Sequence, residues 1–429
     1  MKVICAIFLV FSTHLWSEAI LSAYAVNTRT KEVVFDSQSD ISLIPASCLK
    51  IATTAAALHL LGPESDFQTH LEMDGDVKDG ALHGNIWIRG GGDPCLGSGR
   101  MSSSLPWEEQ IAVWAAAIQQ QGIKEIFGRI IGDTTLWEKA LAPASWAWED
   151  LGNYYGAGAS ALTFHENAYT IDFAPGQKEG DPTTLLRTTP PTLHQILNEV
   201  KTGPIGSGDR ACIYGSEFSV EQAIRGTVPL GVSEFSIKGA IPDTAALCEK
   251  LLSQALKQKG VQIHEEEPIF SSRRVAIHTT YSPTMREIVY FTNQKSINLY
   301  AEHLVKRIGQ KMYRDGSTAS GIKAIVEFWK ERDIEGFNMV DGSGLSRKNF
   351  ITTKQLTSML IKMKESPHFE IFFESLPQIK EGIRAKDGGM SFIGGYAGYK
   401  GDIAFAILIN HATDRSKMRQ ELQQWMDKL

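Results

Sequence analysis

The sequence predicts a mixed α+β protein, in which a central buried helix is surrounded by further helices and strands and a large strand-rich domain is inserted. Three observations support this prediction. An apolar segment of helix length runs from Pro45 to Gly62. Residues 71–268 carry short apolar runs divided by Gly, Pro and Asp. From about residue 273 helical periodicity returns and is followed by two strands near the C-terminus, so we expect both ends of the chain in one domain.

The N-terminal segment indicates export. Residues 1–17 contain a lysine, then a short apolar run and then small polar residues, which is the order of a signal peptide. A buried N-terminal strand is the alternative, but a complete hairpin signal follows directly. We therefore expect residues 18–70 and 273–429 to form the mature first domain, and residues 71–272 to form the insertion.

Composition excludes several classes of function. The 43 Lys and Arg residues stand against 49 Asp and Glu residues, a net charge of −6, and no basic block suggests nucleic-acid binding.

Once Cys5 leaves with the signal peptide, the remaining cysteines allow three pairings, among which the sequence does not choose. Their spacing fits no zinc site. We expect each to be a small apolar filler: Cys48, Cys95, Cys212 and Cys248.

The other elements follow from periodicity and from start and stop signals. Helices are expected over residues 104–121, 243–259, 282–292, 298–308, 321–331, 354–364 and 415–429. Strands are expected over residues 19–26, 32–36, 391–398 and 403–410. The last helix has an apolar stripe that we expect to pack onto the sheet rather than onto a membrane surface: Met418, Leu422, Trp425, Met426 and Leu429.

The central helix also carries the strongest chemical signal. Ser47 and Lys50 fall in its first turn, and residues three apart share a helix face. A hydroxyl and an amine are thus held side by side at a helix N-terminus, as a serine nucleophile with a lysine base requires. A second Ser-x-x-Lys, Ser320 to Lys323, opens an amphipathic helix, so we expect Ser320 to be a helix cap.

Two further motifs complete the pattern. Ser296-Ile297-Asn298 lies between two helical segments, and Lys386-Asp387-Gly388-Gly389 enters the glycine-rich strand near the C-terminus. A literal Lys-Thr-Gly at residues 201–203 is expected in a loop and is attributed to chance. The order Ser-x-x-Lys, Ser-x-Asn and Lys-[polar]-Gly is that of penicillin-interacting serine enzymes.

The chain resembles the low-molecular-mass class C penicillin-binding proteins, the D-alanyl-D-alanine carboxypeptidase/endopeptidase (DacB-like) family. The resemblance rests on segments that span nearly the whole mature chain: IPASCLKIATTAAALHLLG, IWIRGGGDP, WAWEDLGNYYGA, NLYAEHL, VDGSGLSRKN and GYAGYKGDIAFAILIN. The long interval from Ser47 to Ser296 also fits the inserted domain of that family. The resemblance implies a β-lactamase/transpeptidase-like domain, with an antiparallel sheet and helices around the central helix.

The resemblance also implies roles for the motif residues. Ser47 would be the acylating nucleophile and Lys50 its base. Partial burial and the nearby cation Lys386 would lower the pKa of Lys50 so that it can act in its neutral form. Ser296 would pass the proton to the leaving amine. Asn298 would hold the peptide carbonyl of the substrate and orient Lys50.

The substrate site is implied by the same resemblance. Backbone N–H groups of Ser47 and Gly389 would form the oxyanion hole, with Gly388 in the substrate site beside them. Asp150 matches the position that meets the amino group of the stem-peptide diamino acid, although a solvated loop acid is the alternative. Asp387 stands where the family usually has a Thr or Ser that bonds the terminal carboxylate. An ionised Asp387 would repel that group unless it is paired, so this departure bears on carboxypeptidase specificity and not on acylation.

The sequence therefore predicts a serine DD-peptidase of the periplasm or cell envelope that acts on peptidoglycan stem peptides and is acylated by β-lactams. We expect no metal, no other cofactor and no membrane span in the mature chain. Two alternatives stay open: a β-lactamase or esterase on the same scaffold, and a catalytically weak peptidoglycan-binding protein. The sequence identifies no deacylating Glu, which weighs against the first alternative, whereas Asp387 keeps the second open. Stable, rapidly lost or absent labelling by penicillin would separate the three.

Overall fold

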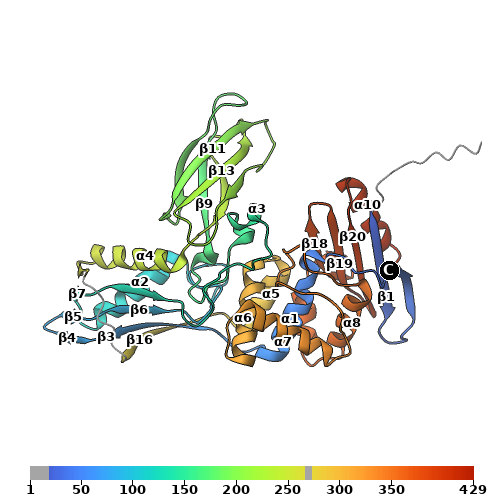
Figure 1. Ribbon diagram of the computed structural model, residues 1–429, viewed down its shortest axis with the longest axis horizontal. Coiled ribbons are helices and arrows are strands. Elements are labelled where there is room, and N and C mark those ends of the chain that lie inside the picture. The colour runs from blue at the N-terminus through green and yellow to red at the C-terminus, as the bar shows by residue number, and fades with distance from the viewer. Residues whose placement is uncertain (1–18, 266–272) are drawn as a thin grey trace, which may run out of the picture.

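The computed structural model describes residues 19–265 and 273–429, so the predicted signal peptide lies outside the described residues. Two parts lie side by side (Figure 1). One contains both ends of the described chain, a sheet and most of the helices, whereas the other is strand-rich and is formed by the middle of the chain. This is the mixed α+β architecture that the sequence predicts.

The first part is built on a six-stranded sheet in the order β17-β18-β19-β20-β1-β2, in which all neighbours are antiparallel. Its strands are β1 (Ile20–Asn27), β2 (Val33–Ser37), β17 (Gln378–Lys380), β18 (Ile383–Met390), β19 (Ile393–Lys400) and β20 (Ile403–Asn410). β1 pairs with β20 along its whole length, with Ile20 opposite Asn410. The first and last strands of the chain therefore share one sheet.

Alternation along β20 gives this sheet two apolar faces, because successive side chains of a strand point to opposite sides. One set of β20 residues joins the core around the helices: Ala404, Ala406 and Leu408. The other set packs with the C-terminal helix α10 (Arg415–Met426): Phe405, Ile407 and Ile409. Met418, Leu422 and Met426 of the predicted stripe are buried there, which confirms that this helix covers the sheet.

The central helix α1 (Lys50–Leu61) is buried through most of its length, as its Ala- and Leu-rich sequence predicts. It follows directly on a single 3₁₀ turn, Ala46–Leu49, and ends before Gly62, whose φ of 91° suits glycine. The helices around it are α5 (Met285–Gln294), α6 (Asn298–Tyr313), α7 (Thr318–Lys330), α8 (Thr353–Lys364) and α9 (Phe369–Ser375).

Two local predictions are wrong in detail. Ser317, not Ser320, caps α7: its hydroxyl accepts from the Ser320 backbone N–H, while Ser320 Oγ bonds Asp315. The glycine-rich run from Lys386 onward is a hairpin rather than one strand. Lys386 lies inside β18, and the chain reverses at Phe392, which has a φ of 69°.

The second part contains four small sheets, ordered β16-β3-β6-β8, β15-β7-β5-β4, β10-β9-β14 and β11-β13-β12. Their strands are β3 (Gln68–Asp74), β4 (Asp76–Lys78), β5 (Ala81–His83), β6 (Ile86–Arg89), β7 (Glu125–Phe127), β8 (Ile130–Asp133), β9 (Ala168–Ala174), β10 (Thr184–Thr189), β11 (Gln195–Gly203), β12 (Cys212–Tyr214), β13 (Glu221–Pro229), β14 (Phe235–Ala240), β15 (Gln262–His264) and β16 (Arg274–Tyr281). Helices α2 (Trp107–Gln120) and α4 (Thr244–Gln258) pack into the same core. β3 and β16 pair with each other, so this sheet reaches across both predicted domain boundaries.

The Lys-Thr-Gly at residues 201–203 is not in a loop. It ends β11, which pairs with β13 over nine positions, and the proline at 204 follows directly. The strand pairing of these residues outweighs the local loop signal that Pro and Gly give. This copy of the motif lies in the strand-rich part, away from α1 (Figure 1).

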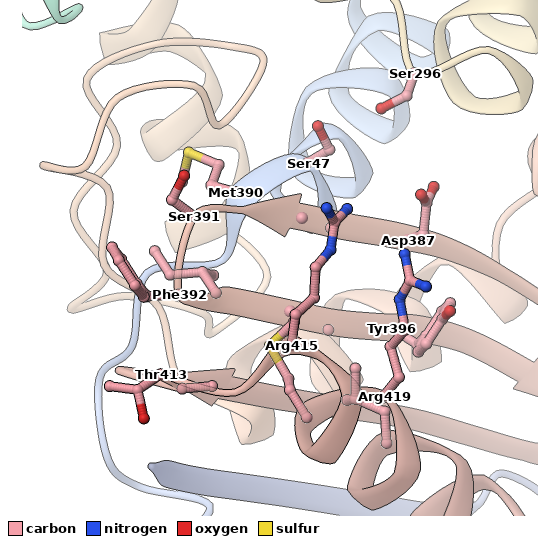
Figure 2. A pocket seen from close by; sticks show the side chains of 18 residues that line it. Ser47, Ser296, Asp387, Met390, Ser391, Phe392, Tyr396, Thr413, Arg415 and Arg419 are labelled. Carbon is pink, nitrogen blue, oxygen red and sulfur yellow. The ribbon is translucent and has the colours of Figure 1, made fainter. Parts of the chain in front are cut away.

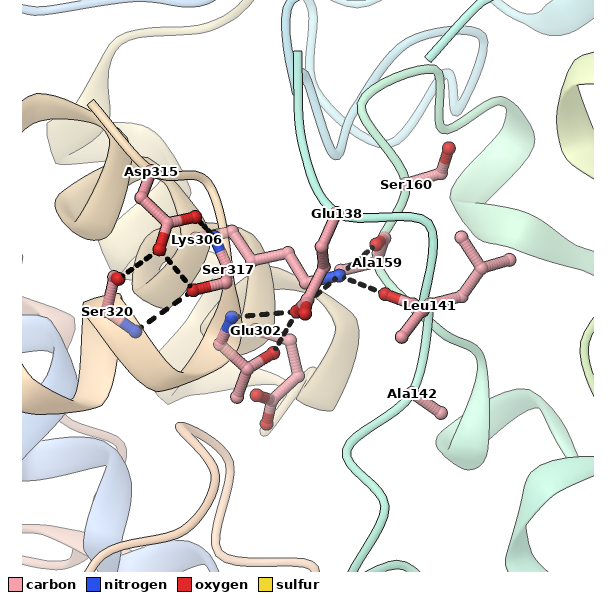
Figure 3. Close-up of polar contacts among 12 residues, drawn as sticks. Glu138, Leu141, Ala142, Ala159, Ser160, Glu302, Lys306, Asp315, Ser317 and Ser320 are labelled. Carbon is pink, nitrogen blue, oxygen red and sulfur yellow. Dashed lines mark hydrogen bonds and ion pairs between the residues drawn. The ribbon is translucent and has the colours of Figure 1, made fainter. Parts of the chain in front are cut away.

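One buried lysine connects the two parts (Figure 3). Lys306 of α6 donates to the carbonyls of Ala140 and Ala159, at 2.6 and 2.9 Å. Its Nζ also lies 3.4 Å from a carboxylate oxygen of Glu138, which accepts from the backbone and hydroxyl of Thr318. These contacts fix both ends of the segment 140–159 to the helices around α1.

Candidate active site

Ser47 lies on the 3₁₀ turn that leads into α1, and Lys50 is the first residue of the helix. Ala46 before it has a φ of 47°, so the chain makes an unusual turn immediately ahead of Ser47. Ser47 is partly exposed at the wall of a cavity, whereas Lys50 is fully buried behind it. The two predicted residues are in direct contact, with Lys50 Nζ 2.9 Å from Ser47 Oγ.

Lys50 has three polar neighbours, and their chemistry fits a neutral amine. Nζ lies 2.7 Å from Asn298 Oδ1 and 2.8 Å from the carbonyl of Ser343, both of which only accept hydrogen bonds. A neutral amine has two N–H groups for these acceptors and one lone pair, which remains for the Ser47 hydroxyl. Burial and, to a smaller extent, the charge of Lys386 together lower the pKa of Lys50 to about 7.

The sequence did not reveal the carbonyl of Ser343 or the group that positions it. Glu302 of α6 is buried, and its carboxylate accepts from the backbone N–H groups of Gly342 and Ser343 at 2.8–3.1 Å. Burial raises the pKa of Glu302 to about 7, against the effect of these hydrogen bonds. The segment VDGSGLSRKN contributes to the family resemblance, but a backbone carbonyl leaves no residue-type signal.

Asp341 organises the same loop. Its carboxylate is buried and accepts from Trp146 Nε1 at 2.9 Å and from the backbone N–H groups of Gly344 and Ser346 at 2.8 and 2.6 Å. Burial raises its pKa despite these bonds. Because Trp146 belongs to the strand-rich part, this contact joins that part to the loop beside Lys50.

The second motif lies where the sequence places it, between α5 and α6. Ser296 has a φ of 55° and lines the same cavity as Ser47 (Figure 2). Asn298 begins α6, and its Nδ2 donates to the carbonyl of Tyr155 at 2.8 Å while its Oδ1 faces Lys50. Asn298 therefore connects Lys50 with the segment 140–159.

The third motif lies on β18 beside the Ser47 turn. β17 covers only the start of β18, around Ile383 and Arg384, so the edge from Lys386 onward has no strand partner there. The N–H of Ala385 donates toward this edge, to Pro377. Because backbone groups two residues apart on a strand point to the same side, the N–H of Gly389 points to the free edge as well.

Lys386 is fully buried. Its Nζ donates to the backbone oxygen of Asp387 at 2.8 Å and to the Asp387 carboxylate at 2.5 Å. Burial acts to raise the pKa of Asp387, but the ammonium of Lys386 outweighs it and holds that pKa below its usual value. Asp387 is thus a paired, ionised carboxylate. Gly388 packs closely, since a Cβ there would lie 2.6 Å from the Pro45 carbonyl, whereas a Cβ on Gly389 would meet nothing within 4 Å.

The cavity in front of Ser47 has a volume of about 720 Å³ (Figure 2). The predicted site residues that line it are Ser47, Ser296, Asp387, Gly388 and Gly389. Its other walls come from β19, from the hairpin turn and from α10.

Asp150 lies on α3 (Trp148–Leu151) within the segment 140–159. Burial and the neighbouring Glu149 raise its pKa, while a hydrogen bond from Tyr155 and the charge of Arg347 act against them. Through Tyr155, whose carbonyl accepts from Asn298, Asp150 is connected to the Ser47 site. The structure thus places it close to the motif residues without direct contact between Asp150 and Ser47.

The remaining copies of the motifs lie apart from this site. Ser320 bonds Asp315 at the start of α7, and Lys201 is exposed on β11. Cys48, next to the nucleophile, is buried with its Sγ 3.5 Å from the Lys386 carbonyl, and burial raises the pKa of its thiol to about 12. The four cysteines of the described chain are free thiols.

Comparison with known proteins agrees with this geometry. Residues 14–429 match the profile of the D-Ala-D-Ala carboxypeptidase 3 (S13) family. The chain belongs to this family. It is therefore a serine peptidase of the D-Ala-D-Ala carboxypeptidase class, as the sequence predicts.

Individual relatives show how much of the chain is shared. The D-alanyl-D-alanine carboxypeptidase of Actinomadura sp. (strain R39) is 26% identical over 437 residues, covering 91% of this chain and 78% of that protein. The D-alanyl-D-alanine carboxypeptidase DacB of Haemophilus influenzae is 23% identical over 382 residues, covering 86% and 75%. The crystal structure of penicillin binding protein 4 (dacB) from H. influenzae matches with a TM-score of 0.79 at 20% identity, over 92% of this chain and 91% of that one.

The described residues show neither a cluster of metal ligands nor a membrane-spanning helix. Residues 19–265 and 273–429 contain no cluster of three or more His, Cys, Asp or Glu side chains that could hold a metal ion. Within the same ranges, no helix has the length and apolar character needed to cross a membrane.

Proposed function

We propose that this S13-family protein cleaves the bond after D-Ala in peptidoglycan stem peptides, both D-Ala-D-Ala and D-Ala-diamino-acid bonds, through an acyl-enzyme on Ser47. The observation that carries the proposal is the contact between Ser47 Oγ and the buried Lys50 amine. A serine hydroxyl is a weak nucleophile until a base takes its proton. Lys50 is that base, because its two N–H groups are engaged and its lone pair is left for Ser47.

Acylation begins at the D-Ala carbonyl and ends with cleavage of the C–N bond. Ser47 Oγ attacks the D-Ala carbonyl carbon while its proton passes to Lys50 Nζ. The resulting oxyanion accepts hydrogen bonds from the N–H groups of Ser47 and Gly389, which usually supply the largest stabilising contribution. The C–N bond breaks as Ser296 passes the proton from Lys50 to the leaving amine. Water later attacks the ester carbonyl while its proton passes to Lys50, and the bond to Ser47 Oγ breaks as Lys50 returns this proton to Ser47.

The substrate lies along the free edge of β18, in the cavity lined by Gly388 and Gly389. Asn298 bonds the peptide carbonyl of the substrate and keeps Lys50 in place. Lys386 supplies positive charge behind the acyl group and keeps Asp387 ionised. Asp150 meets the amino group of the diamino acid at the side of the site formed by the segment 140–159.

The same site takes β-lactams as covalent inhibitors. Support comes from the H. influenzae penicillin binding protein 4 complexed with a β-lactam, whose fold matches this chain with a TM-score of 0.77 at 19% identity. Its peptidoglycan substrate requires the enzyme to reach the periplasm or cell envelope, which agrees with the signal-peptide pattern of residues 1–17.

Labelling with a fluorescent penicillin tests the proposal. We expect stable labelling of the wild type and none of Ser47→Ala, because the hydroxyl that forms the ester is gone. Ser320→Ala is the matched control, since Ser320 also precedes a lysine by three positions but lies on α7, and it should label like the wild type. Labelling of Ser47→Ala would refute the assignment. Rapid loss of the label would indicate a β-lactamase instead, and absence of labelling in the wild type a binding protein.

A further inference from the structure

Two arginines of α10 lie in the wall of the cavity in front of Ser47. Arg415 and Arg419 are one helical turn apart, so they share a face of α10, and both line the cavity together with Ser47 and Asp387. Figure 2 shows both guanidinium groups extending from the helix across the sheet toward β18, the strand that carries Asp387. The helix that places them is fixed to the sheet by its buried Met418 and Leu422.

Neither guanidinium has an ion-pair partner within the described residues, since no carboxylate there lies within 4.0 Å of Arg415 or Arg419. The neighbouring carboxylate of Asp387 is engaged by Lys386 instead. The cavity therefore contains two cations that are free to meet an anion from outside, beside a carboxylate that is already neutralised by a buried lysine.

The third motif leaves the binding of a substrate carboxylate to other residues. Asp387 has no O–H to donate while it is ionised, so it offers nothing to a substrate carboxylate. A substrate that ends in D-Ala-D-Ala nevertheless carries a free carboxylate on the residue that leaves. A planar guanidinium binds a carboxylate through two parallel N–H···O hydrogen bonds. Arg415 and Arg419 line the same cavity as Ser47.

We propose that Arg415 and Arg419 bind the free carboxylate of the leaving residue, replacing the hydroxyl that position 387 lacks. This inference rests on the proposed function, since it names the recognition of the substrate at the same site. The arginines are binding residues and take no part in proton transfer.

The test compares two peptides that differ only at the carboxylate: a stem-peptide analogue ending in D-Ala-D-Ala as the free acid, and the same peptide as the C-terminal amide. We expect R415Q/R419Q to lower kcat/KM for the free acid by at least about tenfold, since hydrogen bonds to charged groups are the stronger kind. For the amide we expect a change of less than about threefold.

Lys417→Gln is the matched control, because it removes one positive charge from the same helix at an exposed residue that does not line the cavity. It should leave both peptides unchanged. R415K/R419K keeps the charge and should recover part of the preference for the free acid. Equal melting temperatures of the variants establish that α10 still packs on the sheet.

Two results would overturn the inference. If R415Q/R419Q leaves the ratio of free acid to amide unchanged, the arginines do not bind the carboxylate, although the enzyme still functions as proposed. If the wild type cleaves neither peptide and is not acylated by penicillin, the proposed function fails and this inference fails with it.

Discussion

At the scale of single residues, the proposed base Lys50 lies in a fully buried position. An ordinary lysine would be protonated at neutral pH and could not accept the proton of Ser47. Burial, with Lys386 nearby, lowers the pKa of Lys50 to about 7 and so makes the neutral form available. The burial that removes water from the amine is therefore also what makes it reactive.

The pH dependence of acylation follows from this pKa. The rate of acylation by penicillin should rise as pH increases through about 7, because only neutral Lys50 accepts the Ser47 proton. Stopped-flow measurement of labelling, with the hydrolysis of free penicillin subtracted, gives the profile. A profile without a step near neutral pH, or a midpoint near the ordinary pKa of a lysine, would contradict the assignment of Lys50 as base.

The same group affects stability with a definite sign. The folded-state pKa of Lys50 is lowered, so the unfolded chain binds more protons between the two pKa values and stability rises with pH over that interval. The cost of the buried charge is complete below about pH 7. Lys50→Met should therefore melt above the wild type in mildly acidic buffer, and this difference should shrink as pH rises.

The sequence predicted that Ser47 and Lys50 lie side by side, because a spacing of three places two residues on one helix face. Ser47 and Lys50 are in contact, and Asn298 joins them from a position distant in sequence. The carbonyl of Ser343 could not be predicted, since any residue supplies a carbonyl. Arg415 gave no signal either, because only the apolar stripe of its helix was informative.

At the scale of elements, β18 approaches the Ser47 turn closely. Its two neighbouring glycines differ, because one packs against this turn and the other faces open space. A Cβ on Gly388 would lie 2.6 Å from the Pro45 carbonyl and 3.0 Å from Cys48 Sγ. A Cβ on Gly389 would point into open space. Neither glycine has a positive φ, so the difference comes from the surroundings.

We expect Gly388→Ala to lower the melting temperature and to slow acylation by penicillin, because the strand and the turn must separate; overpacking of this kind costs about 1–3 kcal/mol. Gly389→Ala should keep the melting temperature and lower kcat/KM for peptides, since its methyl enters the space where the substrate lies. Calorimetry and peptide hydrolysis of both variants check this. Equal destabilisation by the two substitutions would show that β18 does not pack as described.

At the scale of the whole molecule, the sequence predicted an insertion but not how it is attached. The polar residues that attach it give no periodic signal, and the backbone carbonyls among their partners give no residue-type signal. Lys306 of α6 binds the carbonyls of Ala140 and Ala159, the two ends of the segment that carries Asp150 (Figure 3). The buried ammonium thus couples the strand-rich part to the helices around Ser47.

Lys306→Met tests this coupling, because it keeps the length of the side chain and removes all three N–H donors. Each hydrogen bond from a charged group contributes about 1.5–3 kcal/mol, so we expect the melting temperature to fall by at least about 4 °C. The displaced segment should lower kcat/KM for peptides that contain the diamino acid by about tenfold or more. Acylation by penicillin should fall by less than about threefold, because Ser47 and Lys50 contact each other directly, whereas the segment reaches Lys50 only indirectly, through Asn298 and the loop of Asp341.

Lys311→Met on the same helix is the control, since Lys311 is exposed and donates only to the Leu61 carbonyl at 3.3 Å. It should change neither the melting temperature nor the ratio of peptide to penicillin rates. A parallel loss of both activities in Lys306→Met would mean that Lys306 supports α6 itself. Selective loss of the peptide activity would show that the insertion takes part in substrate recognition through the segment that Lys306 anchors.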